Sequence, residues 1–147
     1  MRGAAIFGLK PKQILSRIIP VTIGVDNYKI IKENDECEIS DRNINGDLVC
    51  LSYKIFVKKS QPIKTNHDSE PEIIKPINET INIYYSFDDK INEKNKHFLD
   101  TIEIPLSELP LENRTISVSM RFSNYINVTV TDKESKDSNS KIIYYPF

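Results

Sequence analysis

The stretch Ile116-Ser117-Val118-Ser119-Met120-Arg121-Phe122, followed after three residues by Ile126-Asn127-Val128-Thr129-Val130-Thr131, decides the fold class of this chain. In both halves an apolar residue alternates with a polar one, which is typical of a β-strand with one buried and one solvated face. The three residues between the halves, 123–125, suit a tight hairpin. The stretch therefore predicts two neighbouring antiparallel strands.

The same alternation recurs upstream, over residues 49–57, 81–87 and 102–106, and residues 142–145 are expected to form the last strand. The segments between these runs are polar, and Ile91 is the one apolar residue in the charged loop 88–96. Seven or eight short strands joined by such loops predict an all-β fold, an antiparallel β-sandwich. In the 49–57 strand, the face assigned to the core consists of Val49, Leu51, Tyr53, Ile55 and Val57.

Composition limits the class of protein. The 147 residues suffice for one domain with a single core, and 39% of them are apolar and 28% charged. The net charge of -1 provides no overall positive field for nucleic acid. No apolar run approaches the ~20 residues of a membrane helix. We therefore expect neither nucleic acid nor a membrane as a partner.

Cysteine use bears on the compartment. Cys37 and Cys50 are the only cysteines, and a disulfide between them is possible in an oxidising compartment. Two thiols do not make a disulfide framework, so we interpret them as free, buried thiols in a reducing compartment. Residues 2–9 are at the short limit of a signal-peptide apolar region, and no small-residue cleavage site follows them. A cytoplasmic location is the resulting expectation.

Catalytic motifs are missing from the sequence. The four glycines are scattered, so no phosphate-binding loop is present. His67 and His97 are the only histidines, and neither has a Cys or His at metal-ligand spacing. The sequence predicts no catalytic residues, no cofactor and no metal site.

Binding of an extended peptide fits better. A β-sandwich offers strand edges with which a peptide backbone can pair, while apolar side chains of the peptide fill a pocket. Apolar residues near predicted strand ends could line such a pocket: Val25, Tyr28, Ile74, Ile77 and Ile81. The alternative is that these residues cap the core of the sandwich.

Two N-terminal motifs resemble the family of 70-kilodalton heat-shock chaperones. Residues Arg2-Gly3-Ala4-Ala5-Ile6 are similar to the last helix of the family's actin-like ATPase domain, and Val21-Thr22-Ile23-Gly24-Val25 to the first strand of its substrate-binding β-sandwich. The atypical, heat-shock-protein-twelve-like branch is the closer match. The residues that follow its pattern are Gly8-Leu9, Pro11, Ile14, Arg17, Thr22 and Gly24-Val25, and then Met120-Arg121-Phe122, Ile126, Val128 and Thr131-Asp132.

The resemblance implies a domain organisation. Residues 1–19 would be a remnant of a short helix and an interdomain linker, and residues 20–147 the β-sandwich. The linker residues would be Ile14, Leu15, Ile18 and Ile19, and the peptide-binding residues Val25, Tyr28, Ile74 and Ile81. The ATPase domain of the family would lie upstream of these residues. The helical lid of the family has no counterpart before residue 147.

The expected activity is chaperone-like, nucleotide-independent binding of extended or unfolded apolar peptide segments, with an ATPase domain or a co-chaperone as a further partner. Two alternatives remain. The chain could be a non-catalytic interaction module or gene fragment without a client groove. It could also be the C-terminal piece of a longer ATP-binding heat-shock-like protein, from which any ATPase activity would come.

Overall fold

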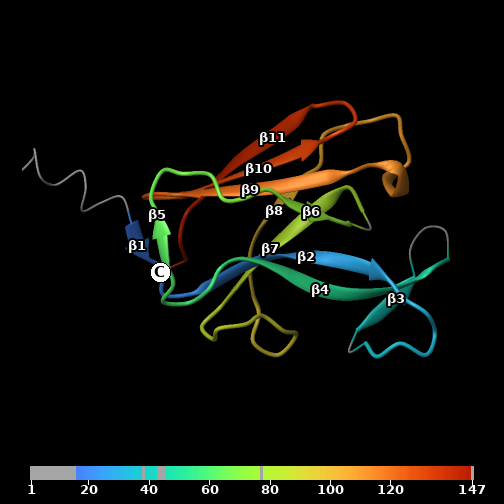
Figure 1. Cartoon of the computed structure of the whole chain (residues 1–147), viewed down its shortest axis with the longest axis horizontal. Coiled ribbons are helices and arrows are strands. Elements are labelled where there is room, and N and C mark those ends of the chain that lie inside the picture. The colour runs from blue at the N-terminus through green and yellow to red at the C-terminus, as the bar shows by residue number, and fades with distance from the viewer. Residues whose placement is uncertain (1–15, 38, 43–45, 77, 147) are drawn as a thin grey trace, which may run out of the picture.

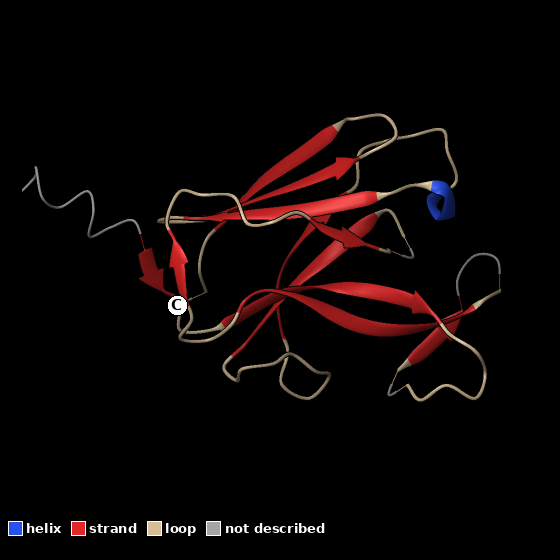
Figure 2. Ribbon diagram, in the orientation of Figure 1, coloured by secondary structure: helices blue, strands red, loops and turns tan. Residues whose placement is uncertain are grey.

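A computed structural model describes residues 16–37, 39–42, 46–76 and 78–146. They form eleven strands and one 3-10 turn (Figure 2). The elements are β1 (Ser16–Ile18), β2 (Thr22–Ile30), β3 (Ser40–Arg42), β4 (Leu48–Val57), β5 (Pro62–Lys64), β6 (Glu72–Ile74), β7 (Thr80–Ser86), β8 (His97–Glu103), η1 (Leu111–Asn113), β9 (Ile116–Phe122), β10 (Ile126–Asp132) and β11 (Ser138–Ile143). The helical stub expected within residues 1–19, and the linker residues Ile14 and Leu15, lie outside the described residues.

The strands form two large antiparallel sheets (Figure 1). One has the order β11-β10-β9-β6 and the other the order β3-β4-β2-β7-β8, while β1 and β5 make a separate two-stranded ribbon. The predicted all-β fold is therefore confirmed. The predicted number of strands is too low, because β1, β3, β5 and β6 have three residues each and are too short to show an alternating pattern.

The hairpin predicted from residues 116–131 is confirmed, with Phe122 opposite Ile126 across the turn. Apolar residues of β9 and β10 face the other sheet and form much of one core. Its central members are Ile23 and Val25 of β2, Ile81 and Ile83 of β7, Ile116, Val118 and Met120 of β9, and Ile126, Val128 and Val130 of β10. Apolar burial on this scale is the main stabilising contribution to the fold.

The face assigned to β4 is partly wrong. Val57 belongs to the core, but Leu51, Tyr53 and Ile55 are only half-buried and lie outside the core cluster. The register of β2 and β4 shifts between Ile23↔Val57 and Gly24↔Ile55, so one extra residue is inserted in β4. Such a bulge moves the residues that precede it to the opposite face of the sheet. Leu51, Tyr53 and Ile55 therefore face away from the sandwich.

The predicted linker is also part of the fold where it is described. Residues of β1 pair with β5, from Ser16↔Lys64 to Ile18↔Pro62. Ile19 is fully buried in the core, whereas Ile18 remains 61% exposed. In the described residues, the segment before residue 20 is thus packed onto the sandwich.

Side chains of β11 cover the outer edge of β8. Asn139 Nδ2 donates to the carbonyl of Glu103 at 2.9 Å, and Lys141 Nζ donates to the carbonyl of Thr101 at 2.9 Å. Lys141 also forms an ion pair with Asp100 at 2.8 Å. The last strands of the two sheets are joined along this side of the sandwich.

A buried arginine joins the two sheets at one end. Arg114, just before β9, is 2% exposed, and its Nε lies 2.9 Å from Oδ2 of the fully buried Asp132 at the end of β10. Its guanidinium also donates to the carbonyl of Pro105 and to Glu79 Oε2, which belong to the segments after β8 and before β7. Burial opposes ionisation of Asp132, but the hydrogen bonds from Arg114 and from backbone amides outweigh it and lower the pKa of Asp132.

Replacing Arg114 with alanine should therefore destabilise the protein strongly. The Arg114→Ala variant leaves the Asp132 carboxylate buried without its cation, a change that costs about 3–5 kcal/mol. Arg121 and Asp68 form a matched exposed pair, 3.1 Å apart, whose loss should cost about 1 kcal/mol or less. Urea denaturation of Arg114→Ala and Arg121→Ala measures both effects, and equal losses of stability would contradict the role assigned to Arg114.

Candidate functional site

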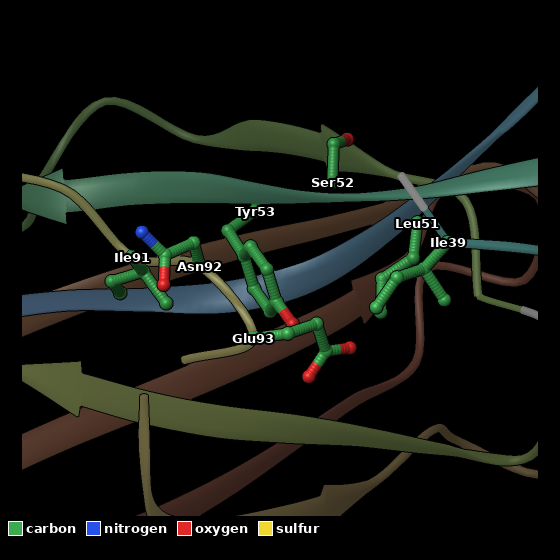
Figure 3. A pocket seen from close by; sticks show the side chains of 7 residues that line it. All are labelled: Ile39, Leu51, Ser52, Tyr53, Ile91, Asn92 and Glu93. Atoms are coloured by element: carbon green, nitrogen blue, oxygen red, sulfur yellow. The ribbon is translucent and has the colours of Figure 1, made fainter. Parts of the chain in front are cut away.

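A cavity of about 240 Å³ lies on the outer face of the five-stranded sheet (Figure 3). Its lining residues come from three segments: the chain before β3, the middle of β4 and the loop between β7 and β8. They are Ile39, Leu51, Ser52, Tyr53, Ile91, Asn92 and Glu93. The tyrosine ring points toward the loop residues, and the side chains of Ile39 and Leu51 lie together at the other end. Apolar and polar side chains thus both line the cavity.

Gly24 allows the β7–β8 loop to rest on the sheet. A Cβ atom at this position would lie 2.6 Å from the backbone oxygen of Lys54 and 3.1 Å from Cδ1 of both Ile55 and Ile91. Ile91 is 8% exposed, so the single apolar residue of the charged loop is its anchor. Asn95 braces the same loop, since its Nδ2 donates to Lys90 O at 3.0 Å. The absence of a side chain at residue 24 thus positions one wall of the cavity.

A disulfide bond between Cys37 and Cys50 supports the opposite wall. The prediction of free thiols is therefore wrong. Pairing of β3 with β4 places Ser40 opposite Cys50, which brings the chain before β3 close enough for the bond, with the two Cα atoms 5.9 Å apart. Composition alone could not reveal this, because the contact depends on the long polar segment folding back onto β4.

Lys96 ties the loop to the tyrosines of the sheet. Its Nζ lies 2.6 Å from Glu93 Oε2, 3.0 Å from the Tyr53 hydroxyl and 4.6 Å from the centroid of the Tyr84 ring. Burial disfavours the ammonium ion, but the hydrogen bonds to Glu93 and Tyr53 outweigh this effect and raise the pKa of Lys96. Lys96 therefore stays protonated and forms a cation–π contact with Tyr84.

Asp26 is a buried carboxyl group beside this cluster. It accepts hydrogen bonds from the backbone amide of Asn82 at 3.1 Å and from Asn82 Nδ2 at 3.3 Å. Burial nevertheless raises the pKa of Asp26 to about 6. Burial, followed by the charge of Asp26, raises the pKa of Tyr28 to about 12. The tyrosine is thus neutral at physiological pH, while the carboxyl group titrates just below it.

Of the four predicted peptide-binding residues, only Tyr28 lies near the cavity. It is half-buried and directly opposite Leu51 in the β2–β4 register, which places both side chains on the same face. Val25, Ile74 and Ile81 are fully buried in the core between the sheets. The expectation that these three line an open pocket is therefore wrong, and their alternative interpretation as core residues is correct. Ile77 lies outside the described residues.

In the described residues, the edge of β4 beside the cavity extends beyond its pairing with β3. Within the described chain, β3 pairs only with Leu48–Cys50, and the amide of Leu51 donates to the carbonyl of Ile39 at 3.0 Å. Alternate residues of a strand direct their backbone groups to the same side. The N–H and C=O groups of Tyr53 and Ile55 are therefore directed to the side on which β3 pairs, beyond the end of β3.

Sequence reasoning missed this site because it assigned Leu51 and Tyr53 to the core. The signal that could have revealed it is Gly24, which sits between two fully buried residues of β2 and marks the bulge. Among the described residues, no group of three or more His, Cys, Asp and Glu side chains is placed to hold a metal ion.

Comparison with known proteins leaves the family open, since the chain matches no family model and no curated protein. The resemblance to heat-shock chaperones thus stays a prediction. In the part of the chain that the structure covers, no helix has the length and apolar character needed to cross a membrane.

Replacing Gly24 with alanine should destabilise the protein by about 1–3 kcal/mol, because the added methyl group clashes with a backbone oxygen and with Ile91. The measurement is the midpoint of urea denaturation, with limited proteolysis of the β7–β8 loop as a local readout. Unchanged stability together with unchanged cleavage would contradict the proposed role of Gly24.

Asp26 should make stability depend on pH between about 6 and 4. Its pKa in the folded chain is about 6, against an ordinary value of 3.8, so the buried charge is destabilising above pH 6 and this penalty disappears as the pH falls toward 4. The Asp26→Asn variant should be more stable than the parent by on the order of 1–2 kcal/mol at pH 7.5, and this advantage should be largely lost at pH 4. Urea denaturation across this range tests it, with the exposed Asp89→Asn as the control. A constant difference between Asp26→Asn and the parent would overturn the assignment.

Proposed function

We propose that this chain is a non-catalytic module that binds an extended peptide segment at the cavity beside β4. The observation that carries the proposal is the combination of a cavity lined in part by apolar side chains with a strand edge that β3 leaves uncovered. Strand addition uses these two features together: main-chain hydrogen bonds contribute affinity, and side-chain pockets contribute specificity.

The backbone of the peptide would continue the line of β3. β3 ends its pairing at Cys50, and the next residues of β4 offer the N–H and C=O groups of Tyr53 and Ile55 on the same side. A peptide strand placed there would satisfy these groups without moving any element of the sheet. Pre-formed sites of this kind avoid the entropy cost of ordering the receptor.

The cavity suits one apolar side chain of such a peptide. Its volume of about 240 Å³ is below the ~300–1,000 Å³ of sites for drug-sized molecules and cofactors. Ile39, Leu51 and Ile91 supply apolar walls, and Asn92 and Glu93 supply polar groups. Since alternate residues of a strand point to the same face, the residues before and after the inserted one would point to the face of the sheet that carries Ser52 and Lys54.

This proposal retains the chaperone-like activity expected from the sequence but moves the binding site. As part of the same proposal, the chain is related to the heat-shock chaperones. Its partner would be an ATPase domain or a co-chaperone. The cytoplasmic location rested partly on free thiols, whereas the disulfide favours an oxidising compartment.

A second candidate function is an interaction module with no peptide groove. The complete burial of Val25, Ile74 and Ile81 favours it, because the groove predicted from the family resemblance is closed. Such a module would bind a folded partner, and its affinity would not depend on residues inside the cavity.

Binding of a fluorescent, leucine-containing heptapeptide should be saturable at micromolar concentrations, as measured by anisotropy. Leu51→Asp places a charge in the cavity and should weaken binding at least tenfold, which corresponds to about 1.4 kcal/mol. Leu106→Asp is the matched control, because Leu106 is 91% exposed and distant in sequence from every cavity residue. No saturable binding, or equal effects of both variants, would refute the proposal.

The same peptide N-methylated at alternate amides separates strand addition from simple insertion of a side chain. Methylation of the amides that face β4 should abolish binding, while methylation of the intervening amides should leave it unchanged. Equal affinities of both methylated peptides would show that the strand edge takes no part.

A further inference from the structure

We infer that the Cys37–Cys50 bond is a site of thiol–disulfide exchange that controls the peptide site, an inference that rests on the proposed function. In the oxidised chain the bond holds Ile39 against Leu51 and keeps the cavity closed on that side. Reduction by a dithiol would release Ile39 and weaken peptide binding.

The bond lies directly beside the cavity in sequence and in space. Ile39 follows Cys37 by two residues, and Leu51 follows Cys50 by one. Both apolar residues line the cavity, and the amide of Leu51 donates to the carbonyl of Ile39 at 3.0 Å. Figure 3 shows the two side chains together at the same end of the cavity. The covalent bond thus holds together the two segments from which this wall is built.

Little else holds the segment that carries Ile39. All three residues of β3 are exposed, and residues 32–36 on the other side of Cys37 are exposed as well. No residue from 31 to 42 belongs to the core cluster of the described chain. With Ile39 only half-buried, this wall is held mainly by the three β3–β4 pairs and by the hydrogen bonds Ile31 N–H to Leu48 O and Leu51 N–H to Ile39 O once the disulfide is cut. Segments with few buried contacts open locally at low free energy.

The bond is also accessible to a reductant. Cys37 and Cys50 are each half-buried, and both Glu36, which precedes Cys37, and Ser40, which pairs with Cys50, are exposed. A thiolate of the reductant attacks one sulfur and forms a mixed disulfide, and the cysteine that leaves takes up a proton. The second thiol of the reductant then displaces the other cysteine. Two electrons and two protons pass from the dithiol to the protein, which gains two thiols while the reductant becomes a disulfide.

Amide hydrogen exchange tests the opening without any peptide. In the full chain treated with dithiothreitol, exchange of the Leu51 amide should accelerate on the order of 100-fold, while amides of the β9–β10 hairpin should keep their protection. Because Cys37 and Cys50 are the only cysteines, the reductant has no other target in the protein. Unchanged exchange at Leu51 after complete reduction would overturn the inference.

Peptide affinity is the second readout, measured by anisotropy for the oxidised chain, the reduced chain and the Cys37→Ser/Cys50→Ser variant. Affinity should fall about tenfold on reduction, and the double variant should bind as weakly as the reduced chain and ignore dithiothreitol. Equal peptide affinity of the oxidised and reduced chains would overturn control of the site. Exchange of the Leu51 amide could accelerate on reduction although neither the oxidised nor the reduced chain binds the peptide. In that case the proposed function is wrong, but the disulfide remains a site of thiol–disulfide exchange whose reduction opens this wall.

Discussion

The buried guanidinium of Arg114 is the interaction on which the arrangement of the two sheets depends. It bonds to Asp132 at the end of β10 and to the segments that flank β7 and β8 in the other sheet. A buried charge is tolerated only where ionic and hydrogen-bonding partners surround it, so this contact fixes the end of the sandwich in one geometry. Apolar packing alone is non-directional and would allow the sheets to slide. The position of β2 and β7, and hence of the candidate site on their outer face, follows from this restraint.

The site itself depends on a one-residue irregularity in β4. The bulge opposite Gly24 directs Leu51, Tyr53 and Ile55 away from the core, and the glycine leaves space for Ile91 to lie on the sheet. The apolar residues of β4 and Ile91 of the β7–β8 loop would otherwise compete for places in the core. The bulge and the glycine instead place them against each other on the outer face of the sheet. The cavity thus depends on the extra residue in β4, which turns Leu51 and Tyr53 to the outer face of the sheet.

Whether a feature of this fold could be predicted from the sequence depends on how far apart in the chain its contacting residues lie. Alternation is local, and it correctly indicated the β9–β10 hairpin and the all-β class. It failed at β4, because a bulge inverts the faces without changing the pattern of residue types. The disulfide and the strand edge depend on how residues 33–47 fold back, which is a tertiary contact that no local pattern encodes. For the same reason the sequence allows two interpretations of Val25, Ile74 and Ile81, as pocket residues or as core residues. Their complete burial in the structure shows that they are core residues.

The side chains of Asn139 and Lys141 along β8 have a consequence for how molecules of this protein meet one another. An uncovered terminal strand invites neighbouring copies to pair with it and so to assemble into fibres. Here the carbonyls of Thr101 and Glu103 already accept hydrogen bonds from β11, and a charged ammonium group stands where another strand would approach. A strand of another copy that approached β8 would have to displace these contacts, so pairing between molecules is disfavoured along this side of the sandwich.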